Sequence, residues 1–170
     1  MRETKDLILK RAVLEDWKSM YYNLWCNDES AKYMLWRPIH TEEEARIRTM
    51  KNIEFQKIDP FAYFVYEKKS EQAIGFAGMK QIADNVFEDT GIAIGPAFTR
   101  KGYGRQILME LVHQAFNELG SKKYVASCRS QNEPSKQLQL SCGFIYSHSE
   151  ARVDPRTDLP YILEFYELTL

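Results

Sequence analysis

Apolar residues recur at helical spacing in two stretches of the chain, and each stretch predicts an amphipathic helix. The clearer stripe covers residues 103–119, where the apolar positions form one continuous face. The other covers residues 14–25. Thr41 and Glu44 match the capping-box pattern, which predicts the start of a third helix that runs to about Gln56. Three helices are therefore expected from periodicity and capping alone.

Runs rich in β-branched and aromatic residues alternate with these helices and predict strands. They cover residues 6–10, 61–66, 73–79, 87–95, 124–128, 143–146 and 161–170. A short fourth helix is expected over residues 132–142, and the polar segment 147–160 is expected to be a loop. No repeat or linker interrupts this order, so we expect one α/β domain over residues 1–170.

The composition is that of a globular protein without a preference for polyanionic partners. Hydrophobic residues make up 44% of the 170 residues, and the net charge is −1. Nucleic acids and anionic membranes usually require a basic excess, so neither is expected as a partner. The three cysteines and three histidines lack metal-ligand spacing, so no metal site is expected. No signal peptide or apolar run of ~20 residues is visible, which favours a cytoplasmic protein.

The candidate chemistry lies between a predicted strand and the clearest predicted helix. This segment combines two glycines with three cations in the order Thr99-Arg100-Lys101-Gly102-Tyr103-Gly104-Arg105. Backbone amides at a helix N-terminus, exposed by glycines and flanked by cations, suit a pyrophosphate. The alternative is an ordinary strand-to-helix turn with a solvated basic face. The order of strand, basic glycine loop, helix and strand favours the phosphate site.

The segments around this loop resemble the GNAT superfamily of acetyl-CoA-dependent N-acetyltransferases. They are Ile92-Ala93-Ile94-Gly95-Pro96 before the loop, and Asn132-x-x-Ser135 and Cys142-Gly143-Phe144 after the helix. The likeness extends over nearly the whole chain. Residues 24–36 and Asn132-x-x-Ser135 look most like the ribosomal-protein N-terminal acetyltransferase branch. Thr99 departs from the family's loop pattern, which begins with glutamine or arginine.

The resemblance implies a mixed, mostly antiparallel sheet of about six to seven strands, splayed at a cofactor cleft and flanked by about four helices. It also implies acetyl-CoA as co-substrate, with no metal. The pantetheine arm would pair with the backbone of Ile92, Ala93 and Ile94 and meet Asn132 and Ser135. The residues expected to hold the phosphates are Arg100, Lys101, Gly102, Tyr103, Gly104 and Arg105.

The resemblance also suggests catalytic residues for acetyl transfer to an amine. Asp89 occupies a position where this branch often has a glutamate, and we expect it to deprotonate the amine, directly or through water. Glu88 is the alternative, because neighbouring side chains on a strand face opposite ways. Gln139 stands where relatives carry a proton-donating tyrosine. Ser135 is the substitute expected to steady the leaving thiolate, and Tyr146 is a more distant candidate.

The acceptor is expected to be a primary amine, on a protein N-terminus or a small molecule, that attacks the thioester directly in a ternary complex. Tyr33, Trp36 and Arg37 are the substrate-pocket candidates, although Trp36 packing against the second helix is equally compatible with the sequence. A homodimer is left open. The alternative function is a non-catalytic acyl-CoA-binding sensor. Another class of nucleotide-binding domain is disfavoured, since Ile107 stands where the Rossmann fingerprint needs a glycine.

Overall fold

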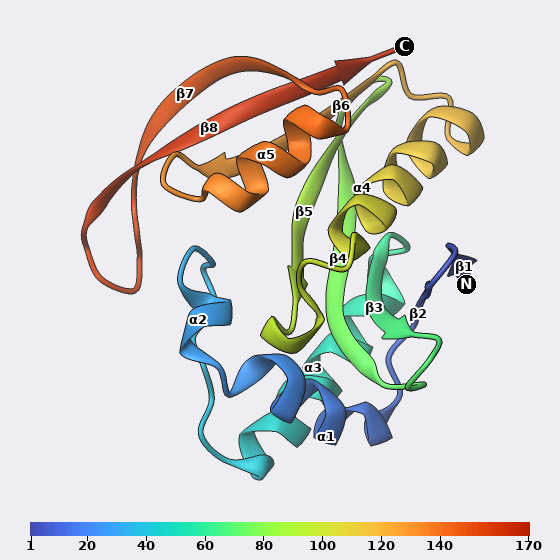
Figure 1. Ribbon diagram of the computed structural model, residues 1–170, viewed down its shortest axis with the longest axis vertical. Coiled ribbons are helices and arrows are strands. Elements are labelled where there is room, and N and C mark those ends of the chain that lie inside the picture. The colour runs from blue at the N-terminus through green and yellow to red at the C-terminus, as the bar shows by residue number, and fades with distance from the viewer.

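A single twisted sheet runs through the computed structural model, which describes residues 1–170 (Figure 1). Its eight strands lie in the order β1-β2-β3-β4-β5-β6-β8-β7. All neighbouring pairs are antiparallel except β5 and β6. The strands are β1 (Arg2–Glu3), β2 (Leu7–Lys10), β3 (Ala62–Glu67), β4 (Ala73–Ala83), β5 (Val86–Ile94), β6 (Lys123–Arg129), β7 (Ile145–Val153) and β8 (Pro160–Thr169).

Five helices cover the sheet, and the predicted capping box starts one of them. They are α1 (Trp17–Met20), α2 (Asp28–Ala31), α3 (Glu42–Ile58), α4 (Tyr103–His113) and α5 (Glu133–Ser141). The Thr41 hydroxyl accepts a hydrogen bond from the Glu44 amide at 3.2 Å, which stabilises the first turn of α3. The predicted helix over residues 14–25 is divided into a 3-10 turn, α1 and a π-helical segment that ends at Trp25.

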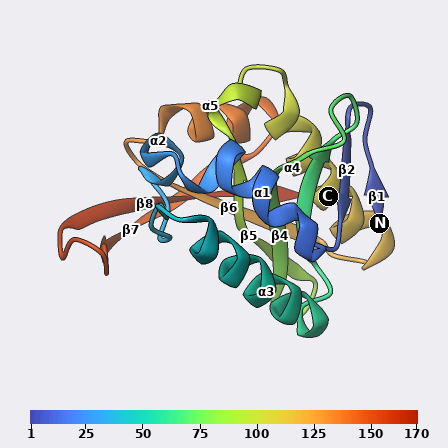
Figure 2. The same cartoon turned by 90° about the horizontal axis from the view of Figure 1, so that it is seen from below.

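The helices form a layer on each face of the sheet, and each layer closes its own core (Figure 2). On one face, α4 packs Ile107, Leu108 and Leu111 against strand residues that include Tyr124. On the other face, residues of α1 and α3 pack with Trp25 and Phe64. The fold is therefore a mixed, mostly antiparallel α/β sheet flanked by helices, as expected, with slightly more strands and helices than predicted.

The parallel pair β5 and β6 separates soon after it forms. Only three residue pairs are in register: Val86 with Lys123, Phe87 with Tyr124, and Glu88 with Val125. Beyond them, β5 continues to Ile94 and β6 to Arg129 without a shared ladder. Along this gap the backbone N–H and C=O groups at the facing edges of β5 and β6 do not pair with one another. The expected splay of the sheet is present, and its apex lies next to Asp89.

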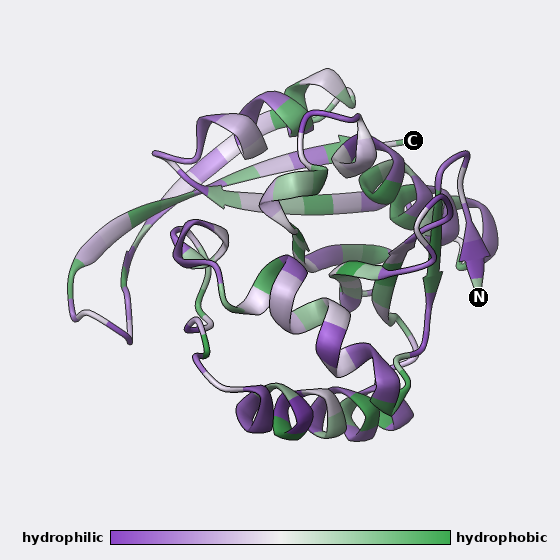
Figure 3. Ribbon diagram, turned by 60° about the horizontal axis from the view of Figure 1, so that its bottom comes forward, coloured by the Kyte–Doolittle hydropathy of each residue, from purple (hydrophilic) through white to green (hydrophobic).

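The prediction of a loop over residues 147–160 is wrong for most of that segment. Strand β7 continues to Val153, and only the turn to Pro160 is irregular. Most of β7 is exposed on both faces because the hairpin extends beyond the helices, so no buried stripe marks it. Figure 3 shows hydrophilic and hydrophobic positions interspersed along this hairpin. Such a strand lacks the periodicity that sequence patterns detect.

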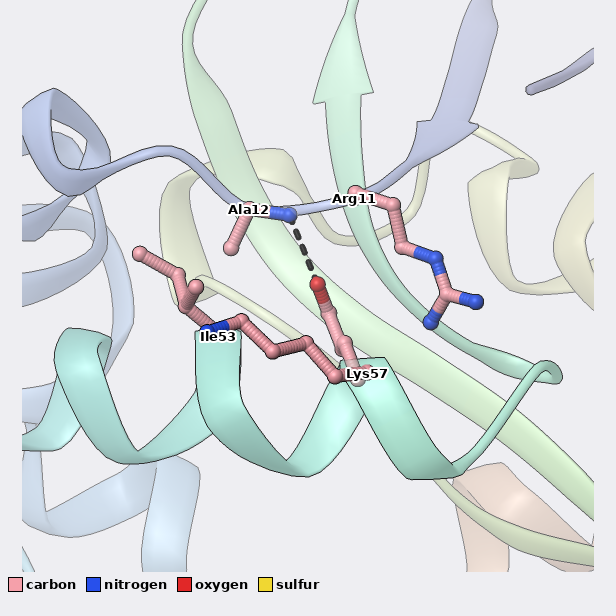
Figure 4. Close-up of a pocket in the computed structure, with 5 residues that line it drawn as sticks. Arg11, Ala12, Ile53 and Lys57 are labelled. Atoms are coloured by element: carbon pink, nitrogen blue, oxygen red, sulfur yellow. Dashed lines mark hydrogen bonds between the residues drawn. The ribbon is translucent and has the colours of Figure 1, made fainter.

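A depression of about 320 Å³ between the end of β2 and α3 has a structural explanation (Figure 4). The Gln56 side chain is buried there and accepts a hydrogen bond from the Ala12 amide at 2.7 Å. This bond fixes α3 against the chain that leaves β2. No helix of the structure is long and apolar enough to cross a membrane.

Candidate active site

Asp89 lies at the apex of the gap between β5 and β6. It is the first residue of β5 beyond the parallel ladder, and its side chain is half-buried. Burial, together with the nearby charge of Glu88, raises the pKa of Asp89 to about 7, although the backbone amide of Ser127 opposes the shift. Since this value lies near neutrality, Asp89 can exchange a proton under ordinary conditions.

Glu88 points to the opposite face of the sheet from Asp89. Its partner across the ladder is Lys80, and the two side chains form an ion pair of 3.4 Å between Nζ and Oε2. Asp89 lies opposite Met79, whose side chain is fully buried in the core beneath α4. A bulge follows immediately, because Gly78 pairs with Gly91 and leaves one residue of β5 unmatched.

The glycine loop forms a concave run of backbone amides at the start of α4. Arg100 and Gly102 both have left-handed backbone conformations, with φ of +61° and +78°. None of the six amides from Arg100 to Arg105 finds a backbone acceptor in the protein. A helix leaves only four amides free, so this loop offers an enlarged set of donors at the positive end of the α4 dipole.

The three cations of the loop have different surroundings. Arg100 is exposed and makes no ion pair with the protein. The Lys101 ammonium lies 3.3 Å from the buried Glu67 carboxylate, and Arg105 donates to the carbonyl of Ser141 at 2.6 Å. Arg100 is therefore the cation that is free to meet a phosphate, while the other two hold the loop against its neighbours.

Tyr103 and Gly104 support the loop from below. The Tyr103 ring is buried, and its hydroxyl donates to Glu67 at 2.7 Å, which raises the pKa of Tyr103 to about 12. Only the backbone of Tyr103 is left to face a ligand. A Cβ added at Gly104 would lie 3.1 Å from the Leu138 side chain, so this glycine allows α5 to approach α4 closely.

The free edge of β5 alternates along residues 92–94. The Gly95 amide donates to the Ile74 carbonyl of β4 at 2.8 Å, and Ala93 lies opposite Phe76 in the same ladder. Because successive residues of a strand direct their amides to opposite sides, Ile92 and Ile94 present theirs to the gap. The backbone of Ala93 is committed to β4, so the expected pairing with a ligand narrows to Ile92 and Ile94.

Residues of α5 and β6 form a short polar chain beside the gap. Asn132 caps α5 by accepting a hydrogen bond from the Ser135 amide at 3.3 Å. The Gln139 amide nitrogen donates to the Ser135 hydroxyl at 3.4 Å, and the Cys128 thiol lies 3.9 Å from the Gln139 side-chain oxygen. Burial raises the pKa of Cys128 to about 11, so its thiol stays protonated and donates to Gln139.

The acceptor-side candidates lie on the chain that connects α2 with α3. Trp36 packs beside Arg48 of α3, whose guanidinium carbon lies 5.6 Å from the Trp36 ring centre. Arg37 is exposed and donates to the carbonyl of Arg156 at 3.2 Å. The Lys32 ammonium lies 5.3 Å from the centre of the Tyr33 ring. None of these side chains touches Asp89 or the glycine loop.

Sequence reasoning missed a buried ionic group that holds the β7–β8 turn against this connection. Asp154 is almost completely buried and pairs with Arg129 at 2.8 Å and with Arg156 at 3.0 Å. Arg156 also donates to the carbonyls of Ala31 and Trp36, both at 3.0 Å. The only local signal was the alternation of charges within a segment predicted as a loop, which did not indicate the long-range partners.

Comparison with known families identifies the class of protein that this fold defines. Residues 6–145 match the acetyltransferase (GNAT) domain family, so the chain belongs to the GNAT acetyltransferases. It is therefore an acetyl-CoA-dependent acetyltransferase. A relative in Bacillus subtilis strain 168, the uncharacterized N-acetyltransferase YnaD, is 22% identical over 142 residues, which cover 82% of this chain and 79% of YnaD.

Solved structures agree on the fold. A GNAT-family acetyltransferase from Bacillus anthracis superposes with a TM-score of 0.82 at 18% identity and covers 98% of this chain and 96% of its own. The microcin C7 self-immunity acetyltransferase MccE, solved with acetyl-CoA and AMP, has a TM-score of 0.82 at 17% identity, covering 98% and 94%. At such identities the likeness concerns the architecture.

The residues of this chain fit acetyl-CoA. The unpaired amides of the glycine loop, with Arg100 beside them, suit the pyrophosphate, and the open gap between β5 and β6 leads from that loop towards Asp89. The free backbone groups of Ile92 and Ile94 lie along the same gap. The groups that suit acetyl-CoA therefore extend from the glycine loop to Asp89.

Proposed function

We propose that this enzyme transfers the acetyl group to a primary amine, with Asp89 as the general base. The observation that carries the proposal is the position of Asp89. It is a carboxyl group with a pKa near 7, held at the apex of the strand gap, where the amine and the thioester would meet. An amine nucleophile is protonated in neutral water, since a lysine-like amine has a pKa near ~10.4. A base at this place is what the reaction needs.

The chemistry requires one bond to form and one to break. The amine nitrogen attacks the thioester carbon, the new C–N bond forms, and the C–S bond breaks as the thiolate departs. The Asp89 carboxylate takes the proton that the nitrogen loses, directly or through one water molecule. No covalent enzyme intermediate is needed, because the two substrates are held together in one ternary complex.

The oxygen of the reacting carbonyl gains negative charge and needs a hydrogen-bond donor. The Gly95 amide is already bonded to the Ile74 carbonyl, so it cannot serve. The Ile92 amide faces the gap by strand alternation, lies only three residues from Asp89, and is the donor that we propose. It lies on the same strand as Asp89, so donor and base share one rigid element.

Ser135 is proposed to donate a hydrogen bond to the departing thiolate. The Gln139 nitrogen donates to the Ser135 oxygen, so that bond does not use the serine's own proton. The Cys128 thiol holds the Gln139 side chain in that orientation. Gln139 therefore serves to orient Ser135 in a fold where it replaces the tyrosine that many relatives use as the acid.

A solved structure of similar fold, with an amine bound, supports a primary amine as the acceptor. A spermidine N-acetyltransferase from Vibrio cholerae, solved with CoA and spermine, shares the fold with a TM-score of 0.75 at 17% identity. Tyr33, Trp36 and Arg37 are proposed to border the acceptor, because the connection that carries them faces the β7–β8 turn. No nucleic acid or membrane partner and no metal is proposed for the reaction.

The test is the release of coenzyme A from acetyl-CoA, measured with a thiol reagent against polyamines, amino acids, N-terminal peptides and aminoalkyl compounds. Wild-type protein should release coenzyme A only with an acceptor, and mass spectrometry should find an N-acetyl product. Asp89→Asn should bind acetyl-CoA as the wild type does and lose most of its turnover. Equal turnover in this variant over the whole pH range would rule out the base role.

A further inference from the structure

A cleft of about 470 Å³ opens at the carboxyl end of β6, on the side where β5 and β6 have separated. Three segments line it: Lys32 at the end of α2, Arg129–Gln131, and the β7–β8 turn with Asp154 and Arg156. Figure 1 shows the β7–β8 hairpin reaching down beside α2. Residues of the turn line the cleft on that side.

The charge of this cleft is positive. Asp154 is its only carboxylate, and Arg156 and Arg129 both donate to it. The hydrogen bonds from Arg156 come first in holding the pKa of Asp154 well below its usual range, so it stays ionised and is fully paired. Three cations against one anion leave an excess of two positive charges.

Two of the cations retain unused donors. Arg129 bonds to Asp154 through one nitrogen, and its guanidinium carbon lies 4.0 Å above the Tyr161 ring, which fixes its plane. The Arg129 guanidinium forms no other hydrogen bond within the protein. Lys32 is exposed and has no carboxylate partner. Both donors suit an anion, since a planar guanidinium and an ammonium bind carboxylate and phosphate oxygens.

The cleft lies within reach of the proposed reaction centre. Ser127, whose amide faces Asp89, is two residues before Arg129 on β6. Arg129 is about 7 Å further along β6, on the face opposite to Tyr124 and Cys128, and β5 and β6 share no ladder there, so the sheet is open between Asp89 and the Arg129 side. A molecule with its amine at Asp89 could therefore place a second group at Arg129, provided that several bonds separate the two.

We infer that the acceptor is a primary amine that carries an anionic group, a carboxylate or a phosphate, several bonds from its nitrogen. Arg129 and Lys32 bind the anion, and the Arg129–Asp154–Arg156 group holds the Arg129 plane in place. This inference rests on the proposed function, because it names the substrate class of that same site. It disfavours polyamines, whose positive charges would meet an excess of cations.

The first experiment compares acceptors of equal chain length: an aminoalkyl phosphate, an aminoalkyl carboxylate, an amino alcohol and a diamine. The anionic acceptors should have kcat/KM values about tenfold or more above that of the amino alcohol, and the diamine should be poorest. The ratio between phosphate and carboxylate identifies the anion. Equal values for all four acceptors, or a preference for the diamine, would overturn the inference.

Lys32→Gln is the cleaner variant, because Lys32 is exposed and unpaired, whereas Arg129 also holds Asp154. It should lower kcat/KM about fivefold for the anionic acceptors and leave the amino alcohol unchanged. Lys122→Gln, at an exposed lysine outside the cleft, is the matched control and should leave kcat/KM unchanged for both the anionic acceptors and the amino alcohol. Losses of the same size with every acceptor would assign Lys32 a structural role and contradict the inference.

Binding separates this inference from the reaction itself. An alkyl phosphonate without an amine cannot be acetylated, yet it should bind to the wild type, and Lys32→Gln should weaken that binding about fivefold. Calorimetry measures this without turnover. Absence of binding overturns the inference even if amines are acetylated, and binding without any amine turnover overturns the proposed function alone.

Discussion

Replacing Asp89 with asparagine should make the protein more stable above neutral pH while removing most of its activity. Burial is the first cause that raises the pKa of Asp89 from 3.8 to about 7. A carboxyl group whose pKa is higher in the folded protein than in the unfolded chain holds its proton more tightly when folded. Ionisation of Asp89 therefore disfavours the folded state, and the penalty grows from about pH 4 to pH 7.

The size of the penalty follows from the displacement of the pKa. From 3.8 to about 7, at about 1.36 kcal/mol per pKa unit, it amounts to about 4 kcal/mol. Asp89 is only half-buried, and water relieves part of this cost. We expect Asp89→Asn to unfold with a free energy about 1–3 kcal/mol higher than the wild type at pH 8.5, and with little difference near pH 4.

Urea unfolding at pH 4, 6, 7 and 8.5, beside kcat/KM at the same values, measures both effects. Loss of a general base should lower the rate roughly 10²–10⁴-fold, and the remaining rate should lack the wild-type rise through pH 7. If the variant is less stable than the wild type at pH 8.5, ionised Asp89 does not destabilise the folded protein, and its pKa is not raised. An unchanged pH profile would exclude Asp89 as the general base.

Three further changes test other parts of the site. Gly102→Val should weaken coenzyme A binding tenfold or more in calorimetry, because a β-branched residue resists the φ of +78° that exposes the loop amides. The control is Gly120→Val, which has a φ of +68° and equally open space. It should lower the stability by a similar amount and leave coenzyme A binding unchanged. Glu88→Gln removes a charge that raises the pKa of Asp89, so the acidic limb of the pH–rate profile should move to lower pH, and an immobile limb would contradict the assignment. Asp154→Asn should lower the unfolding free energy by about 3 kcal/mol at pH 7, because it leaves Arg129 and Arg156 without their buried partner. Since the pKa of Asp154 is lowered in the folded protein, this difference from the wild type should vanish in strong acid. Urea unfolding at both pH values measures the difference.

The glycine loop at the start of α4 was predictable because its signals are local. Glycines, cations and the apolar stripe of the following helix stand within one short segment, and α4 begins at Tyr103 as that pattern requires. The same holds for Thr41 and Glu44, whose capping box is present at α3. The sequence also predicted that Glu88 and Asp89 face opposite ways, since strand alternation needs no knowledge of the partner strand.

The remaining features depend on contacts between distant segments. The apex of the gap is set by where β5 and β6 stop pairing, and the bulge after Asp89 is visible only in the pairing with β4. The Arg129–Asp154 pair joins positions 25 residues apart. Sequence patterns report local periodicity and turn chemistry, so they contain no information about which of the many charged residues meet in space.

The most direct test of the account is coenzyme A release from acetyl-CoA as a function of pH, with the best acceptor of the aminoalkyl series and with none. Release should require an amine, produce an N-acetyl product, and rise as Asp89 loses its proton near pH 7. Tight acetyl-CoA binding without release on any amine, or release that is indifferent to Asp89, would rule out the proposed acetyl transfer with Asp89 as base.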